Sequence, residues 1–272
     1  MMSELRERKS ENKQRYNVDE RDVQYFSAFA NTWWDDTGEL KVLREMNQVR
    51  VPFIRNGLIV NNDPEYWVEG QTSNTLKGFK ILDVGCGAGV LSEPLGLYGA
   101  EVVGIDPSKD LIEAANNHLS KTKETHKLNV SYYSETIEEH VMKYREKYDA
   151  IIASEVVEHV VDKKAFLKSC IEALKPGGSI FVTTLNKNWF SWICAIIFAE
   201  FILGILPKHT HIYDQFISPG DVKDMLKELN CRTIKILGWR NEWFWSKYKF
   251  QSNTSIQYGL HAIKQAKTDN FH

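Results

Sequence analysis

The stretch FKILDVGCGAG, residues 79–89, joins a predicted strand to a glycine-rich loop. Its first half is an almost wholly apolar run of strand length, and its second half carries three glycines in a G-x-G-x-G spacing. Glycines directly after a strand let the backbone approach a ligand closely and let the next helix pack tightly against the sheet. We therefore expect a strand, a ligand-binding loop and a helix in this order.

The alternation that begins there continues along most of the chain. Apolar runs predict strands at 79–84, 101–106, 129–134, 148–154 and 179–185, and helical patterns lie between them at 88–98, 108–121, 135–146 and 162–174. A helix at 219–229 and two strands, at 233–239 and 255–264, close the domain. Strands alternating with helices form parallel βαβ units whose sheet is covered on both faces. The fold class is therefore α/β, with a Rossmann-like, mostly parallel seven-stranded sheet.

The segments before the sheet divide into three parts. Residues 1–20 are charged and lack apolar periodicity, which predicts a flexible tail. Residues 21–60 show helical spacing and predict an N-terminal helical cap, and the polar residues 61–77 predict a loop. The main domain is expected to occupy residues 78–266, with an insertion at 187–218 after the fifth strand.

That insertion holds an apolar run of 18 residues, 189–206, which only Ser191 and Glu200 interrupt. A membrane-spanning helix needs about 20 apolar residues, so spanning is the least favoured interpretation. A buried cap helix over the site is a second alternative. We favour a helix that lies in the membrane interface, with its aromatic residues as anchors.

Composition excludes several classes of protein. The 34 Lys and Arg residues nearly balance the 36 Asp and Glu residues in a chain of 272, which argues against a nucleic-acid-binding protein. The four cysteines are far apart and form no CxxC pair, so neither a disulfide scaffold nor a zinc ribbon is expected. The start of the chain lacks the apolar core of a secretory signal, and its acidic residues match a mitochondrial presequence poorly.

Two aspartates indicate which nucleotide the loop binds. Asp106 ends the second strand, where a carboxylate can accept hydrogen bonds from both ribose hydroxyls; a helix cap in a tight turn is the alternative. Asp83 directly precedes Gly85, so it disfavours a pyrophosphate and favours a cation such as the ammonium group of an amino acid. The G-x-G-x-G spacing also differs from the dinucleotide fingerprint, which disfavours a nicotinamide oxidoreductase.

These motifs resemble the class I S-adenosylmethionine-dependent methyltransferases. LDVGCGAG (82–89) stands for the first motif of that family, VVGID (102–106) for the second, and KPGG (175–178) for the turn before the fifth strand.

More distinctive stretches resemble the O-methyltransferases of ubiquinone biosynthesis: 26–54 with its WWD motif, ASEVVEHV (153–160), LKPGGSIFVTTLN (174–186) and PKHTH (207–211). The similarity extends from about Phe26 to Lys264. The chain departs from the family at Ala88 and at His209, where relatives often carry glycine.

The resemblance implies methylation of a hydroxyl group on a polyprenylated catechol, with S-adenosyl-L-methionine as methyl donor. The expected donor-binding residues are Arg50, Asp83, Gly85, Gly87, Asp106 and Ser154. Arg50 is expected to pair with the methionine carboxylate, which suits a bidentate guanidinium group. The resemblance also implies a peripheral protein at the matrix side of the mitochondrial inner membrane, or at the cytoplasmic membrane face in a bacterium. Its expected partners are the polyprenyl substrate, the membrane surface and a multi-protein ubiquinone-biosynthesis complex, and no nucleic acid.

Glu155, Glu158 and His159 follow the fourth strand. If a helical turn begins there, their i, i+3 and i+4 spacing places them on one face, where two carboxylates and an imidazole can hold Mg²⁺ or a similar divalent cation. Such a cation would lower the pKa of the catechol hydroxyl. Methyltransferases with a similar motif also use it without metal to orient the substrate, so that alternative stays open.

The candidate catalytic residues are Glu155 and His211. His211 suits a general base by residue type, although it can equally be an ordinary loop histidine. A non-catalytic lipid-binding subunit and a methyltransferase for another small hydrophobic acceptor remain alternative functions.

Overall fold

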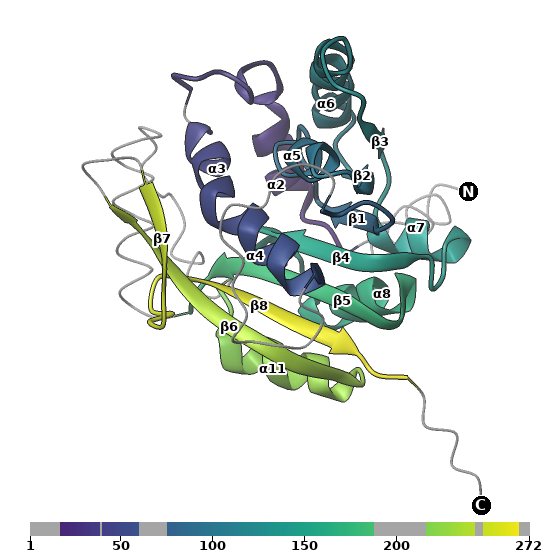
Figure 1. Ribbon diagram of the computed structural model, residues 1–272, viewed down its shortest axis with the longest axis vertical. Coiled ribbons are helices and arrows are strands. Elements are labelled where there is room, and N and C mark those ends of the chain that lie inside the picture. The colour runs from purple at the N-terminus through teal and green to yellow at the C-terminus, as the bar shows by residue number, and fades with distance from the viewer. Residues whose placement is uncertain (1–16, 39, 60–74, 188–215, 243–246, 267–272) are drawn as a thin grey trace, which may run out of the picture.

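The computed structural model describes residues 17–38, 40–59, 75–187, 216–242 and 247–266, the side chains of 241 and 242 excepted. These residues form one mixed sheet with helices on both faces (Figure 1). The strand order is β3-β2-β1-β4-β5-β8-β6-β7. The expected α/β class and two-sided covering are confirmed.

The parallel half of the sheet consists of β1 (Lys80–Val84), β2 (Glu101–Ile105), β3 (Asn129–Tyr133), β4 (Tyr148–Ser154) and β5 (Leu174–Leu185). The connecting helices are α5 (Ser92–Leu97), α6 (Lys109–Lys123), α7 (Ile137–Lys143) and α8 (Lys163–Ala173). All nine elements overlap the ranges expected from the apolar pattern. Because the strands run parallel, their carboxyl ends meet at one edge of the sheet.

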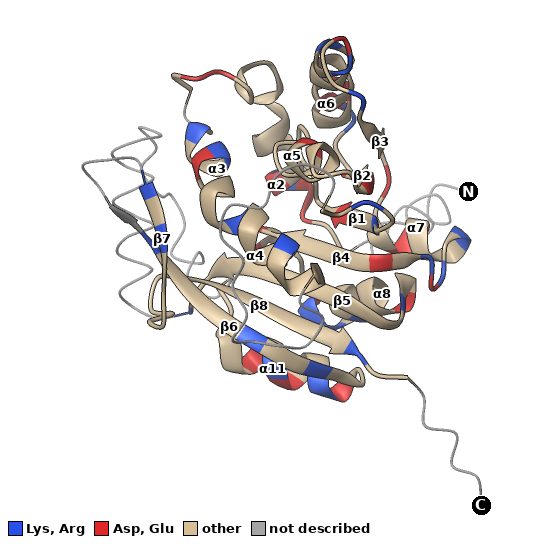
Figure 2. Cartoon of the chain, in the orientation of Figure 1, with Lys and Arg blue, Asp and Glu red and all other residues tan. Residues whose placement is uncertain are grey.

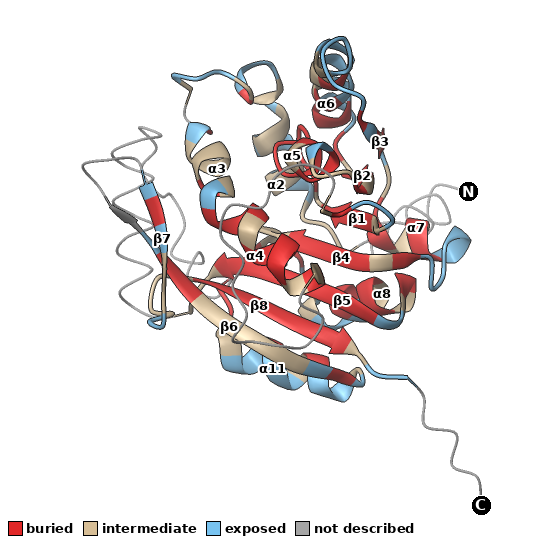
Figure 3. Cartoon of the chain, viewed as in Figure 1, coloured by how far each residue is buried: buried red, intermediate tan, exposed pale blue. Residues whose placement is uncertain are grey.

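Residues at alternating positions along the strands pack into two separate hydrophobic cores. Leu82 and Val84 face a cluster that includes α7, α8 and α11 (Pro219–Glu228), whereas Ile81 faces a cluster that includes α4 (Asn47–Ile59), α5 and α6. The strands β1, β2, β4 and β5 are buried along most of their length, as Figure 3 shows for β4 and β5. This burial on both faces explains why the strands read as apolar runs rather than alternating patterns.

The antiparallel half has one strand more than expected. β8 (Gln257–Lys264) pairs with β5, β6 (Cys231–Glu242) pairs with β8, and β7 (Lys247–Gln251) pairs with β6. The sheet therefore has eight strands, and the prediction of seven was wrong. β7 escaped detection because it is a short edge strand, in which buried Tyr248 lies between two exposed lysines.

The N-terminal region is helical, as expected, and comprises α2 (Glu20–Ser27), a 3-10 turn η1 (Ala30–Thr32), α3 (Lys41–Glu45) and α4 (Asn47–Ile59). α4 lies on the sheet, where Phe53 meets Phe181 edge to face at 5.7 Å. Val18 forms an isolated antiparallel bridge with Val160, so the segment before α2 is tied to the loop after β4.

Several predictions fall outside the described residues: most of the tail, most of the loop 61–77 and nearly all of the insertion with its apolar run 189–206. No helix in the described part of the chain combines the length and hydropathy needed to cross a bilayer. Acidic and basic residues are interspersed along the surface helices, for example along α11, as Figure 2 shows.

Candidate active site

The glycine loop lies at the carboxyl end of β1 and adopts a backbone that requires glycine. Gly85 and Gly87 have φ values of +69° and +53°. A Cβ atom on Gly85 would lie 2.4 Å from Cγ2 of Val156, and one on Gly87 would lie 2.8 Å from Cζ2 of Trp33. The two glycines therefore combine a left-handed backbone with close approach of neighbouring side chains, and no larger residue fits without displacement.

Asp106 closes the loop from the neighbouring strand. Its carboxylate accepts hydrogen bonds from the backbone N–H of Gly87, at 3.1 Å, and of Ser108, at 2.8 Å. Burial raises the pKa of Asp106 to about 6, and these two hydrogen bonds oppose the shift. The aspartate thus fixes the loop and still has lone pairs for a ribose hydroxyl.

Asp83 lies beneath the loop at the end of β1. It accepts a hydrogen bond of 2.5 Å from the hydroxyl of Ser92, and burial raises its pKa to about 6. The nearby charge of Arg50 lowers that pKa, and the charge of Asp106 raises it. A cationic ligand group would relieve the repulsion between the two aspartates, in line with the expected ammonium group.

Arg50 extends from α4 and is 3% exposed. Its guanidinium group donates to Oγ of Ser154 at 2.9 Å, to Oδ1 of Asn47 at 2.7 Å and to the carbonyl of Leu43. Nε has no hydrogen-bond partner among the described residues, although it is buried. A buried N–H without a partner is rare in folded proteins. The Nε–H group is therefore suited to donate a hydrogen bond to the carboxylate of S-adenosylmethionine.

A chain of hydrogen bonds links Arg50 to Glu155. The hydroxyl of Thr183 donates to Oε1 of Glu155 at 2.8 Å, and Ser154 and Thr183 lie 2.8 Å apart. Because Thr183 has one hydroxyl proton and gives it to Glu155, Ser154 must donate to Thr183. The bonds therefore all point the same way, from Arg50 through Ser154 and Thr183 to the Glu155 carboxylate.

Glu155 is held in an unusual backbone conformation with φ +57°. Such values in a residue other than glycine often mark functional sites. Burial raises the pKa of Glu155 to about 7, helped by the negative charge of Glu158, while Arg50 and the Thr183 hydroxyl lower it. A carboxylate with this pKa can accept a proton near neutral pH.

The helical turn expected to align the three candidate metal ligands is not formed. The turn after β4 is a 3-10 turn over Val157–His159, so Glu155 precedes it and lies outside its register. Glu158 accepts a hydrogen bond from Thr184 at 2.8 Å, and Nδ1 of His159 lies 3.0 Å from Oδ2 of Asp22. No group of three or more His, Cys, Asp or Glu side chains able to hold a metal ion occurs in the described ranges. The helical register on which the expected convergence rested is therefore absent, and binding of a cation by the three residues stays a prediction.

His159 connects the site to the N-terminal cap instead. Burial works against protonation of His159, but the hydrogen bond to Asp22 and the charges of Glu158, Asp22 and Glu155 together raise its pKa. Its ring also meets Phe26 edge to face at 5.2 Å. Both partners belong to α2, so His159 ties that helix to the loop after β4.

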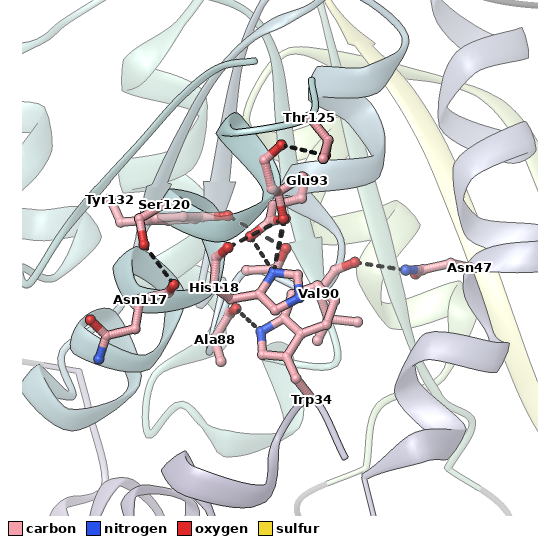
Figure 4. Close-up of polar contacts among 12 residues, drawn as sticks. Trp34, Asn47, Ala88, Val90, Glu93, Asn117, His118, Ser120, Thr125 and Tyr132 are labelled. Carbon is pink, nitrogen blue, oxygen red and sulfur yellow. Dashed lines mark hydrogen bonds and ion pairs between the residues drawn. The ribbon is translucent and has the colours of Figure 1, made fainter. Parts of the chain in front are cut away.

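The tryptophan pair of the WWD motif contacts the glycine loop, a role that the motif alone did not predict. Trp33 is buried against Gly87, and Nε1 of Trp34 donates to the carbonyl of Ala88 at 2.9 Å (Figure 4). Thr183 and Thr184 were also missed, because their roles depend on contacts across the sheet edge. His211 lies outside the described residues, and its role stays a prediction.

Comparison with known proteins agrees with this fold. The family described as "Methyltransferase domain" matches residues 42–236. Among solved structures, magnesium protoporphyrin IX methyltransferase from Synechocystis with bound S-adenosylmethionine has a TM-score of 0.57 at 16% identity, over 92% of this chain and all of that one. A methyltransferase from Thermotoga maritima, described as a possible histamine N-methyltransferase, has a TM-score of 0.57 over 88% and 98% of the two chains, at 16% identity. These similarities establish the fold.

Curated relatives define the family more narrowly. The mitochondrial ubiquinone biosynthesis O-methyltransferase of Rattus norvegicus is 41% identical over 91% of this chain and 70% of its own length, and that of Homo sapiens is 41% identical over 91% and 65%. The chain thus spans about two thirds of the mammalian proteins. The ubiquinone biosynthesis O-methyltransferase of Proteus mirabilis is 34% identical over 93% of this chain and 95% of its own. The chain therefore belongs to the ubiquinone biosynthesis O-methyltransferases, a family of S-adenosylmethionine-dependent methyltransferases.

Proposed function

We propose that this protein transfers the methyl group of S-adenosylmethionine to a hydroxyl oxygen of a polyprenylated catechol in ubiquinone biosynthesis. The relatives' names support the pathway and the reaction type. The observation that carries the chemistry is Glu155, a half-buried carboxylate with a pKa near 7 beside the expected donor-binding residues Arg50 and Ser154. Such a group is suited to take the proton of a phenolic hydroxyl.

Each residue of the site has a distinct task in this proposal. When bound, S-adenosylmethionine supplies a methyl group activated by a sulfonium sulfur. Arg50 holds the donor's carboxylate, Asp106 its ribose, and the glycine loop leaves space for its backbone contacts. Glu155 accepts the hydroxyl proton of the acceptor as the hydroxyl oxygen attacks the methyl carbon; the carbon–sulfur bond of the donor breaks, and S-adenosylhomocysteine leaves as a neutral thioether. Alignment of the two reactants contributes most of the acceleration.

The role of a divalent cation stays a prediction from the family resemblance. Because Glu155, Glu158 and His159 are directed to different partners, no step here is assigned to a metal. The Lewis-acid alternative differs from the Glu155 mechanism in a measurable way: it predicts that chelation stops the reaction.

We further propose a peripheral protein at the matrix side of the mitochondrial inner membrane, or at the cytoplasmic membrane face in a bacterium. The expected contacts are the membrane surface and a multi-protein ubiquinone-biosynthesis complex. The names of the mammalian relatives support the mitochondrial location. Support for the membrane contact comes from the apolar run at 189–206.

The central test is transfer of labelled methyl from S-adenosylmethionine to catechols that carry no, a short or a long prenyl tail. The parent protein should methylate the prenylated catechols, and the rate should fall as pH drops through about 7, because Glu155 becomes protonated. Glu155→Gln should lower kcat by about 10²- to 10⁴-fold and remove that inflection. Glu113→Gln, an exposed carboxylate on α6, serves as the matched control.

Three outcomes would contradict the proposal. Absence of transfer to any catechol would favour the non-catalytic lipid-binding alternative. Preference for an acceptor without a prenyl tail would favour the alternative that the protein methylates another small hydrophobic molecule. An unchanged pH profile in Glu155→Gln would remove Glu155 from the proton transfer.

A further inference from the structure

The carbonyl groups of the glycine loop differ in where their hydrogen-bond donors come from. The carbonyls of Cys86 and Gly89 accept from backbone N–H groups at 3.0 and 3.1 Å, those of Gly89 and Glu93 respectively. These donors belong to the loop and the helix that follows it. The geometry of the loop is therefore fixed in part by its own sequence.

Two other carbonyls accept from side chains of the N-terminal cap. Nε1 of Trp34 donates to the carbonyl of Ala88 at 2.9 Å, and Nδ2 of Asn47 donates to that of Val90 at 2.8 Å. Ala88 and Val90 are both buried, and Ala88 has no exposed surface at all. A buried carbonyl that loses its donor is destabilised, because no water replaces it. The cap thus determines how these two peptide groups are oriented.

Trp34 is held in place from its other side by a second group of residues. Its indole stacks on the imidazole of His118, with ring centroids 3.4 Å apart and planes inclined by 1°. Nδ1 of His118 lies 2.9 and 3.0 Å from the two oxygens of Glu93, and Thr122 donates to Glu93 at 2.8 Å (Figure 4). Glu93 is almost fully buried, so this arrangement is well packed.

From this geometry we propose that Trp34 is a positioning residue for the methyl donor. It orients the Ala88 peptide of the glycine loop, and the stack on His118 together with Glu93 fixes its indole. None of the three residues needs to touch the donor or the acceptor. Their effect passes through the Ala88 carbonyl and reaches the neighbouring Gly87 and Asp106, whose hydrogen bond lies in the expected donor site.

This inference rests on donor binding at the glycine loop and is independent of the acceptor's identity. It predicts a selective effect on the donor. Trp34→Phe keeps an aromatic ring for the stack on His118 but removes the N–H group. The Kd of S-adenosylmethionine, and its KM, should rise about three- to tenfold, the range expected for one lost neutral hydrogen bond. The kcat and the KM of the acceptor should change less than twofold.

His118→Ala provides a second variant, because it removes the stack and leaves the indole N–H intact. It should raise the same two donor constants in the same direction. The double variant should bind S-adenosylmethionine about as tightly as the weaker-binding of the two single variants, because both changes act through the same hydrogen bond. His126→Ala, an exposed histidine just beyond α6, is the matched control and should leave all constants unchanged.

The experiment measures donor binding by calorimetry, methyl transfer by label incorporation and thermal stability of the ligand-free proteins. Donor constants within twofold of the parent in both single variants would overturn the inference. A parallel loss of kcat, donor affinity, acceptor affinity and thermal stability would also overturn it, because it would indicate a merely structural role. If Trp34→Phe does not fold, the selective change in His118→Ala decides the question alone. A parent protein that does not bind S-adenosylmethionine would contradict the proposed function instead.

Discussion

Arg50→Lys tests how the site recognises the amino-acid part of the methyl donor. The guanidinium group is buried, makes hydrogen bonds to Ser154 and Asn47, and leaves Nε unpartnered among the described residues. Lysine keeps the positive charge but has a single nitrogen, so it cannot hold these neighbours and a ligand carboxylate together. The variant therefore removes the branched guanidinium group and keeps the positive charge.

The size of the effect follows from the number of bonds lost to the ligand. One charge-assisted hydrogen bond contributes about 1.5–3 kcal/mol, and each 1.4 kcal/mol is a factor of ten in affinity. The Kd of S-adenosylmethionine should therefore rise by about tenfold to about a hundredfold. Arg50→Gln, which removes the positive charge altogether, should raise the Kd of S-adenosylmethionine further. It should also raise the pKa of Glu155 and of Asp83, since the charge of Arg50 lowers both.

Calorimetry with two ligands separates the carboxylate contact from a general disturbance. S-adenosylhomocysteine carries the carboxylate, whereas 5′-methylthioadenosine has the nucleoside and the sulfur but no amino acid. Arg50→Lys should weaken the first ligand and leave the second within twofold of the parent. Arg145→Lys, whose ion pair with Glu172 is largely exposed, should change neither. Equal weakening of both ligands, or of neither, would refute the assignment of Arg50 to the carboxylate.

The remaining predictions concern the loop, the metal and the membrane. Asp106→Ala should raise the Kd of S-adenosylmethionine at least about tenfold and lower the thermal stability, because two buried backbone N–H groups lose their acceptor. Calorimetry measures the affinity and thermal unfolding measures the stability. Unchanged affinity would remove Asp106 from the site. Gly87→Ala should abolish donor binding, since its Cβ would lie 2.8 Å from Trp33 at a positive φ, and normal binding would contradict the close fit. Treatment with EDTA should leave methyl transfer intact if Glu155 alone accepts the proton, whereas loss of activity that Mg²⁺ restores would support the metal prediction. Serine replacements in the apolar run 189–206 should release the protein from liposomes into the supernatant; retention on the liposomes would favour an internal cap.

Much of the fold was determined by the sequence alone. Each strand of the parallel half is an apolar run separated from the next by a helix, and this pattern is local, so it can be read without tertiary contacts. The glycine loop and Asp106 follow from the same reasoning, because parallel strands bring their carboxyl ends to one edge. Arg50 and Ser154 required the family resemblance, since nothing local distinguishes them from other polar residues of their elements.

Tertiary structure decided what the pattern left open. The strand that was not predicted, β7, depends on pairing with β6 and on an edge position that tolerates lysines. The helical spacing expected for Glu155, Glu158 and His159 does not apply, because Glu155 adopts a positive φ and the turn begins only at Val157.

Contacts between residues distant in sequence also lay beyond the pattern. Asp22 and His159, Trp34 and Ala88, and Thr183 and Glu155 meet only after the cap and the sheet edge have packed together. No periodicity records such contacts, because hydrogen bonds between side chains depend on the relative position of whole elements. The sequence thus indicated the loop at which we expect the donor to bind, and packing decided which neighbours orient that loop and which carboxylate the hydrogen bonds from Arg50 reach.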